Sequence, residues 1–242
     1  MLLVMIGDVN ELFIRWSVPH WAALAVVGAF ALAISAIFHQ GRNEEFRFRV
    51  GKIFALLLLA LWIIVSLVRL FWSNDGGWKE SLPLHYCNLM EPVCCMALWF
   101  RSRWACRLAY FGIMAACVQA LVTPDLLHGI PHVEYFLFFI SHGLLLIAGV
   151  FIPVVLGWRA EPWDAVKVLL QSDAYILCMI PVNFFLGTNY GFTEFAPQGS
   201  ILDYMGGSPW YFLSMQIPAM GVLFLLSLPV RKRERGKEKG TR

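Results

Sequence analysis

Long apolar runs alternate with short polar segments along the whole chain. A membrane helix needs roughly 20 mostly apolar residues to cross the hydrocarbon layer, and seven runs approach or exceed that length. They cover residues 19–38, 51–71, 82–100, 104–123, 133–156, 163–187 and 209–230. This pattern predicts an all-α fold: one domain over residues 1–242, built as a bundle of seven transmembrane helices with a basic tail at 231–242.

Composition supports a polytopic membrane protein. Hydrophobic residues make up 59% of the chain and charged residues only 14%, whereas soluble domains carry about 25% charged residues. The sequence shows no phosphate-binding loop and no dinucleotide-binding motif, so we expect no soluble cofactor. No basic face interleaved with aromatics is present either, and we expect no nucleic-acid partner.

The distribution of positive charge predicts the orientation. With seven crossings, every second connecting loop lies on the same side of the membrane as the C-terminal tail. All but three of the 19 Lys and Arg residues lie on that side; the exceptions are Arg15, Arg69 and Lys79. Lys and Arg concentrate on the cytoplasmic side of membrane proteins. We therefore expect an external N-terminus and a cytoplasmic C-terminus, in the cell membrane and most simply in a bacterial cytoplasmic membrane.

Polar residues interrupt the outer halves of five predicted helices, while the inner halves are almost purely apolar. At 1.5 Å per residue, Cys87 would lie about 7 Å and Glu91 about 13 Å below the outer boundary, on one helix face. Polar groups at such depth favour a pocket over lipid contact. We expect an outward-facing pocket with these lining residues: His85, Cys87, Asn88, Glu91, Gln119, His142, Asn183, Asn189, Tyr190 and Gln216. The aromatic loop 187–211 either caps this pocket or forms part of an aromatic belt at the membrane interface.

Cys87 and His142 are the candidates for catalysis. A thiol becomes a nucleophile as the thiolate, and a neutral imidazole is suited to take its proton. The alternative is that Cys87 is a packing residue and His142 a hydrogen-bonded core histidine. Asp173, alone near the middle of its run, is expected to make a hydrogen bond between helices. We expect no metal site, because Gly129 and Pro131 break the helix that would align the only HxxxH pair.

Several short motifs in order resemble a known family. The segments LPLHYCNL (82–89), LVTPDLL (121–127), PH (131–132), FFISHG (138–143), NFFLGTNY (183–190) and SPWYF (208–212) resemble the YwaF family of bacterial integral membrane proteins. That family is similar to vertebrate transmembrane protein 164, a phospholipid acyltransferase with an essential Cys and His. The resemblance implies these roles for Cys87 and His142. The local order differs, since in the vertebrate protein the histidine directly follows the cysteine, whereas here His85 precedes it.

These observations lead to a functional hypothesis. The chain is expected to be a lipid acyltransferase or esterase that uses a Cys/His pair, with membrane lipids as its partners and substrates. Asn183, Gln119 or Gln216 would donate hydrogen bonds to the oxyanion. Two alternatives stay open: a transporter or small-molecule binder that uses the same pocket, and a structural protein whose polar residues join helices.

Overall fold

The helices follow the apolar runs of the sequence. The computed structural model describes residues 12–38, 43–72, 77–196, 200, 204–207 and 210–232, so the predicted tail beyond residue 232 and parts of the loop 187–211 lie outside the described residues. The α-helices are α1 (Val18–Ile37), α2 (Glu44–Trp72), α3 (Tyr86–Phe100), α4 (Arg103–Gly112), α5 (Val118–Val122), α6 (Val133–Val154), α7 (Asp164–Leu186) and α8 (Trp210–Ser227). The described residues contain two isolated β-bridges and no named strand.

Six of the helical rods in the described part are long and apolar enough to cross a membrane. One of them joins α4 and α5 through a π-helical turn, η2 (Ile113–Cys117), and another ends in the 3-10 turn η5 (Leu228–Val230). The all-helical, multi-pass membrane architecture predicted from the sequence is thereby confirmed at this level. Most helix ends agree with the predicted spans to within a few residues.

Two helices begin at other places than the sequence pattern suggested. Helix α2 starts at Glu44, well before residue 51, because the Asn43 side chain accepts the N–H of Glu45 and the first turn is acidic. Helix α3 starts at Tyr86 and has 15 residues, about 22 Å. The preceding residues are not helical, since Pro83 lacks an N–H and disfavours helical geometry before it. Cys87 therefore lies in a first turn and not in the second turn of a longer helix.

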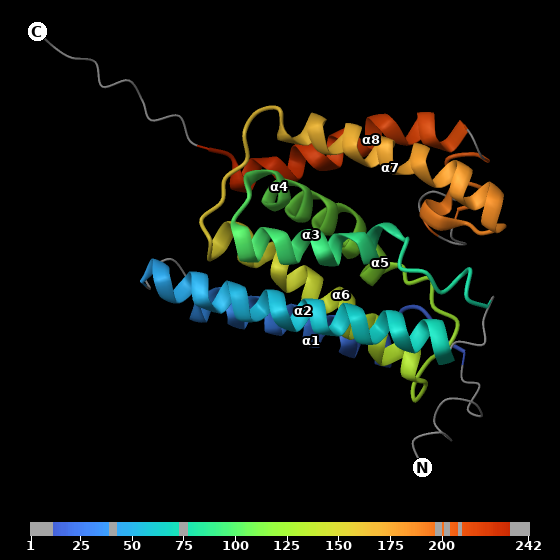
Figure 1. Cartoon of the computed structure of the whole chain (residues 1–242), viewed down its shortest axis with the longest axis horizontal. Helices are drawn as coiled ribbons and strands as arrows, with labels where there is room; N and C mark the ends of the chain where they lie inside the picture. Colours follow the sequence, from blue (N-terminus) through green and yellow to red (C-terminus); the bar gives the residue numbers. More distant parts are fainter. Residues whose placement is uncertain are drawn as a thin grey trace, which may run out of the picture.

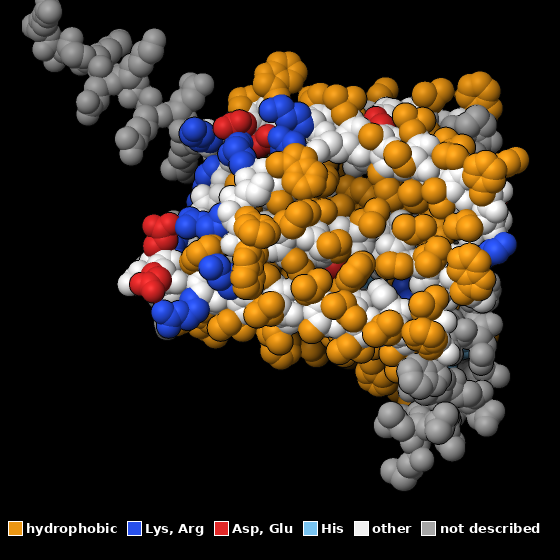
Figure 2. All heavy atoms as spheres, in the orientation of Figure 1, with side chains coloured by type: hydrophobic (Ala, Val, Ile, Leu, Met, Phe, Trp, Pro, Cys, Tyr) orange, Lys and Arg blue, Asp and Glu red, His pale blue; other side chains and the backbone are white. Residues whose placement is uncertain are grey.

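Helices α3, α4 and α6 form the core of the bundle. Figure 1 shows α1 and α2 along one side, α7 and α8 along the other, and α3, α4 and α6 between them. Small buried residues let the central helices approach closely: Cys94, Ala97 and Ala109 have no exposed surface. At Gly112, a Cβ atom would lie 2.6 Å from the Sδ atom of Met90. The outer helices present apolar side chains on their flanks (Figure 2), as lipid contact requires.

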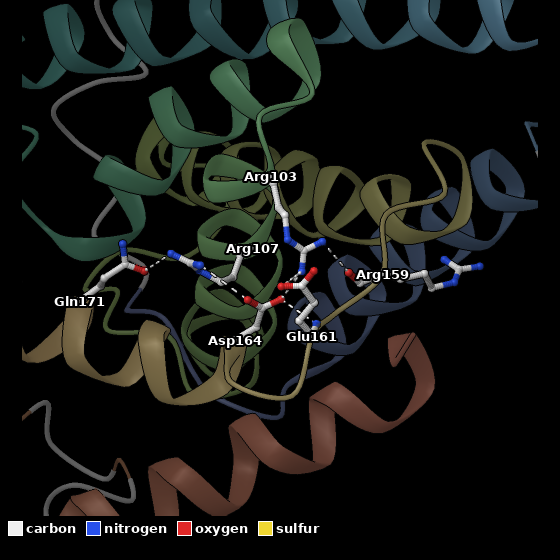
Figure 3. A network of polar contacts seen from close by, with 6 residues as sticks. All are labelled: Arg103, Arg107, Arg159, Glu161, Asp164 and Gln171. Atoms are coloured by element: carbon white, nitrogen blue, oxygen red, sulfur yellow. Dashed lines mark hydrogen bonds and ion pairs between the residues drawn. The ribbon is translucent and has the colours of Figure 1, made fainter. Parts of the chain in front are cut away.

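Charged side chains gather at one end of the bundle, which we call the basic end (Figure 2). Its buried element is the carboxylate of Asp164, 1% exposed, at the first residue of α7. Arg103 donates to it at 2.9 Å, and Arg107 forms an ion pair with it at 3.5 Å (Figure 3). A buried carboxylate is tolerated when cations compensate its desolvation. This network ties the start of α4 to the start of α7.

Candidate functional site

Cys87 is the second residue of helix α3. The helix follows His85, whose extended backbone ends the loop and whose side chain makes no capping hydrogen bond. The first turn of a helix carries N–H groups without partners inside the helix and the positive end of its dipole. The Cys87 thiol, which is free and half-buried, therefore sits where a helix favours negative charge.

His142 lies in the middle of α6 with 8% of its surface exposed. Its Nδ1 atom is 3.0 Å from the carbonyl oxygen of Phe138, and its ring stacks on the Phe138 ring with centroids 4.1 Å apart. A carbonyl only accepts, so Nδ1 must carry the proton. The neutral ring is then the tautomer with an unprotonated Nε2, which is able to accept a proton.

The fold brings Cys87 and His142 together although they are far apart in sequence. The Cys87 thiol interacts with the His142 ring and with the thiol of Cys117. Glu91, one turn further along α3 and only 4% exposed, lies within electrostatic range of His142 and of Cys87. We refer to Cys87, His142, Glu91 and Cys117 as the thiol cluster.

Cys117 enters the cluster through a departure from α-helical geometry. It is the last residue of the π turn η2, and it is fully buried. A π turn places one more residue in a helical turn and rotates all residues that follow it about the axis. Such turns are rare and are frequent at functional sites. Gly149 of α6 lets this turn pack closely, because a Cβ there would lie 3.0 Å from Cγ2 of Ile113.

Helix α7 and the loop after it hold the start of α3 in place. The Tyr175 hydroxyl donates to the carbonyl oxygen of Leu84 at 2.9 Å, and the Tyr86 hydroxyl pairs with that of Ser172 at 3.1 Å. The Tyr175 side chain also lies within electrostatic range of Cys87. Helix α7 therefore holds in place the helix turn that carries the thiol.

His85 belongs to the rim of the site. Its ring packs edge-on against Tyr190, with centroids 4.9 Å apart, and against Phe192 in the 3-10 turn η3 (Tyr190–Phe192). The Tyr190 hydroxyl donates to the carbonyl oxygen of Lys79. Burial raises the pKa of Tyr190 to about 12, so this hydroxyl stays protonated and keeps its donor role at neutral pH. Tyr190 and His85 thus join the loop to the segment before α3.

Asn183 has a structural role that the sequence did not reveal. Its side-chain nitrogen donates to the Tyr190 carbonyl at 2.8 Å and to the Thr193 hydroxyl at 2.6 Å. Its side-chain oxygen accepts from Thr188 and from the Tyr190 N–H. Both donors and both acceptor positions are occupied. Asn183 therefore organises the loop and has no group left for a pocket or an oxyanion.

Three other predicted pocket residues also bond elsewhere. Gln119 is exposed and donates to Thr123 one turn further on. Asn189 donates to the Phe195 carbonyl and accepts from the Glu194 N–H, as a turn residue does. Gln216 of α8 donates to Asp173 of α7 at 3.0 Å, which confirms the interhelical hydrogen bond expected for that aspartate. Asn88, beside Cys87, is half-buried and has no hydrogen bond from its amide among the described residues.

Sequence reasoning missed three residues near the thiol cluster. Cys117 reads as a packing residue in an apolar run, and Tyr175 as one of many aromatics. Arg69, in the last turn of α2, lies within electrostatic range of Glu91 and His85. Its signal was present in the sequence, because Arg69 is one of the three basic residues that the charge pattern assigns to the side opposite the tail, and it lies within the apolar run 51–71.

Replacing Asn183 by alanine should loosen the loop without touching the thiol cluster. The change leaves the N–H and C=O of Tyr190 without partners in a residue that has no exposed surface. We expect a loss of about 2 kcal/mol in stability, seen as a melting temperature lower by about 5 °C for the purified protein. Gln119→Ala is the matched control, because its amide is exposed and should be dispensable. Equal melting temperatures for wild type and Asn183→Ala would contradict this role.

Comparison with models of known protein families gives a match over most of the chain. A model of a family described as the TMEM164 family matches residues 15–227. This range includes every helix from α1 to α8 and all four residues of the thiol cluster. The comparisons with curated proteins and with solved structures found no match.

Proposed function

The chain belongs to the TMEM164 family of multi-pass membrane proteins, and on that premise we propose that it is a lipid acyltransferase or esterase. Cys87 is the nucleophile and His142 the general base and acid. The substrate is an acyl ester of a membrane lipid, and the acceptor is a second lipid hydroxyl or water. The observation that carries this proposal is the interaction of the Cys87 thiol with a histidine ring whose other nitrogen is bonded to a backbone carbonyl.

The chemistry follows from this pair. Nε2 of His142 takes the thiol proton while the sulfur forms a bond to the ester carbonyl carbon. The tetrahedral intermediate collapses by breaking the carbon–oxygen bond, and the imidazolium returns its proton to the departing alkoxide. The resulting thioester is attacked by a hydroxyl whose proton goes to Nε2, and collapse regenerates the thiolate, which the imidazolium reprotonates. Atoms and protons balance, and no further reagent is required.

The surroundings support each charged state in turn. The carboxylate of Glu91 stabilises the imidazolium, which lies within its electrostatic range. The first-turn N–H groups of α3, which no side chain caps, are suited to stabilise the oxyanion. They take the role that the sequence assigned to Asn183, Gln119 and Gln216, whose amides are bonded elsewhere. The Asn88 amide is a further donor of this kind.

The proposed topology places the site in the external half of the membrane. Seven crossings, with α3 as the short third one, put the basic end in the cytoplasm by the positive-inside rule. Cys87, at the other end of α3 from Arg101, then lies toward the external side. A bacterial cytoplasmic membrane is the simplest location for this orientation.

Trapping of the acyl-enzyme tests the proposed function. The purified protein is incubated with phosphatidylcholine carrying a labelled acyl chain, quenched in acid and digested. Labelled acyl thioester on the Cys87 peptide, released by neutral hydroxylamine, is the expected result. The Cys178→Ser variant serves as starting protein, because Cys178 is an exposed thiol on α7. Saturable lipid binding with no adduct on Cys87, over a panel of phospholipids and neutral glycerides, would contradict the enzyme and favour a binding or transport protein.

A further inference from the structure

Two cavities adjoin at the basic end and share the side chain of Arg159. The first, of about 390 Å³, lies among the turn after α3, the turn after α6 and the residues after η5. The second, of about 340 Å³, runs between α4, α6 and η5. Four of the eight residues that line the first cavity are Arg or Lys, whereas apart from Arg159 the second is lined by apolar side chains and Tyr110. An adjoining charged and apolar pair of this kind matches an amphipathic ligand.

The charged cavity carries an excess of cations. Arg101, Arg103, Arg159 and Lys232 line it, and the described residues of its lining include no carboxylate. The acidic neighbours lie outside the lining: Glu44 pairs with Arg101, and Glu161 and Asp164 pair with Arg103. The cavity remains cationic despite these three acids, because Arg159 and Lys232 make no ion pair among the described residues. Arginine forks are suited to phosphate oxygens.

The other two cations, Arg159 and Lys232, are positioned by backbone contacts. The Arg159 guanidinium donates to the carbonyl oxygens of Pro153 and Trp158 at 2.7 and 2.8 Å. Lys232 is placed by its own backbone, whose N–H donates to the Ala160 carbonyl at 3.0 Å. Figure 3 shows the Arg159 side chain directed away from Asp164. The Arg103 side chain donates both to the Asp164 carboxylate and to the backbone carbonyl of Arg159. The site is therefore built before any anion arrives.

The apolar cavity extends the site along the bundle. Met114, Val150, Val154 and Val230 are among its lining residues. A free phosphate ion would occupy only the cationic cavity. A phospholipid has an anionic headgroup that fits the cationic cavity and an acyl chain that fits the adjoining apolar one. We propose that the basic end binds one anionic phospholipid, with its phosphate on the four cations and an acyl chain in the apolar cavity.

This lipid site is separate from the thiol cluster. Arg101 directly follows the last residue of α3 and Cys87 lies in its first turn, which puts about 20 Å of helix between them. The inference therefore does not rest on the proposed catalysis. The bound lipid is a resident of the opposite leaflet and not the acyl substrate.

Lipid binding is measured by native mass spectrometry of the detergent-purified protein. Phosphatidylglycerol is the probe, with phosphatidylcholine of the same acyl chains as its comparison. The double variant Arg101→Gln/Lys232→Gln should bind phosphatidylglycerol roughly 10- to 30-fold more weakly, because two cations near the phosphate are removed. Its binding of phosphatidylcholine should change little. Arg49→Glu is the control, since Arg49 is exposed and pairs only with Glu45 among the described residues.

Two further arms separate the lipid from free phosphate. Val150→Trp fills the apolar cavity and should weaken phosphatidylglycerol binding, while 10 mM inorganic phosphate should not displace the lipid. Displacement by phosphate together with unchanged binding in Val150→Trp would overturn the lipid in favour of a free anion. Equal loss in Arg49→Glu and in the double variant would overturn the site altogether. Cys87→Ala should bind phosphatidylglycerol like the wild type, so failure of the catalytic proposal leaves this test intact.

Discussion

Replacing Cys87 by alanine should lower acyl transfer by about 10³-fold or more, because the substitution removes the atom that carries the acyl group. The change deletes one sulfur from a half-buried first helical turn. We expect the protein to remain folded, with a melting temperature close to that of the wild type. The measurement is transfer of a labelled acyl chain from phosphatidylcholine in the Cys178→Ser background, with the thioester adduct followed on the same samples.

Cys117→Ala is the control that identifies the nucleophile. Both thiols belong to the thiol cluster and interact with each other. Cys117, however, is fully buried at the end of the π turn, and a substrate has no access to a fully buried sulfur. Cys117→Ala should therefore keep most of the activity and retain the adduct on Cys87. Loss of activity in Cys117→Ala with retention in Cys87→Ala would reverse the assignment.

The sequence pattern predicted the helices well because a membrane imposes a length and an apolar composition on each crossing. It also placed Cys87 and Glu91 on one helix face, and both lie within range of His142. The start of α3 was missed because apolar character continues through Leu82–Leu84 even though Pro83 prevents a helix there. Hydrophobicity alone does not distinguish a buried loop from a helical turn.

The failures at individual polar residues have physical causes as well. Gln119 follows the π turn, which rotates every later residue of its rod, so a regular helical period puts it on the wrong face. Asn183 lies near the end of α7, as its place in the apolar run predicted, but its partners come from a loop that folds back over the helix end. Depth follows from position along a run. The hydrogen-bond partner of a polar side chain depends on tertiary packing, and the spacing of residues in a single sequence does not reveal that packing.

Replacing His142 by alanine should change the pH dependence of the reaction as well as its rate. Without the base, the Cys87 proton must leave to hydroxide, and acylation at neutral pH should fall by about 10²- to 10⁴-fold. The rate at which Cys87 reacts should then rise steadily with pH in the variant. In the wild type Nε2 of His142 accepts the thiol proton, so the rate should reach its plateau at lower pH. The measurement is the rate of Cys87 alkylation by a membrane-permeant haloacetamide from pH 6 to 10, in the Cys178→Ser background.

Ser141→Ala separates the base from its packing environment. Ser141 neighbours His142. Its hydroxyl donates to the same Phe138 carbonyl that orients the ring, and it lies 3.4 Å from Nδ1 of His142, a longer contact than the 3.0 Å between Nδ1 and that carbonyl. Removing that hydroxyl leaves the Nδ1 contact with Phe138 in place, so the tautomer and the pH profile of alkylation should remain those of the wild type. If His142 served packing alone, a different result would follow for His142→Ala. That variant would be less stable, but the Cys87 thiol of its folded fraction would be alkylated with the wild-type pH profile. Superimposable profiles for wild type and His142→Ala would therefore remove the histidine from the mechanism, even if the variant were less active.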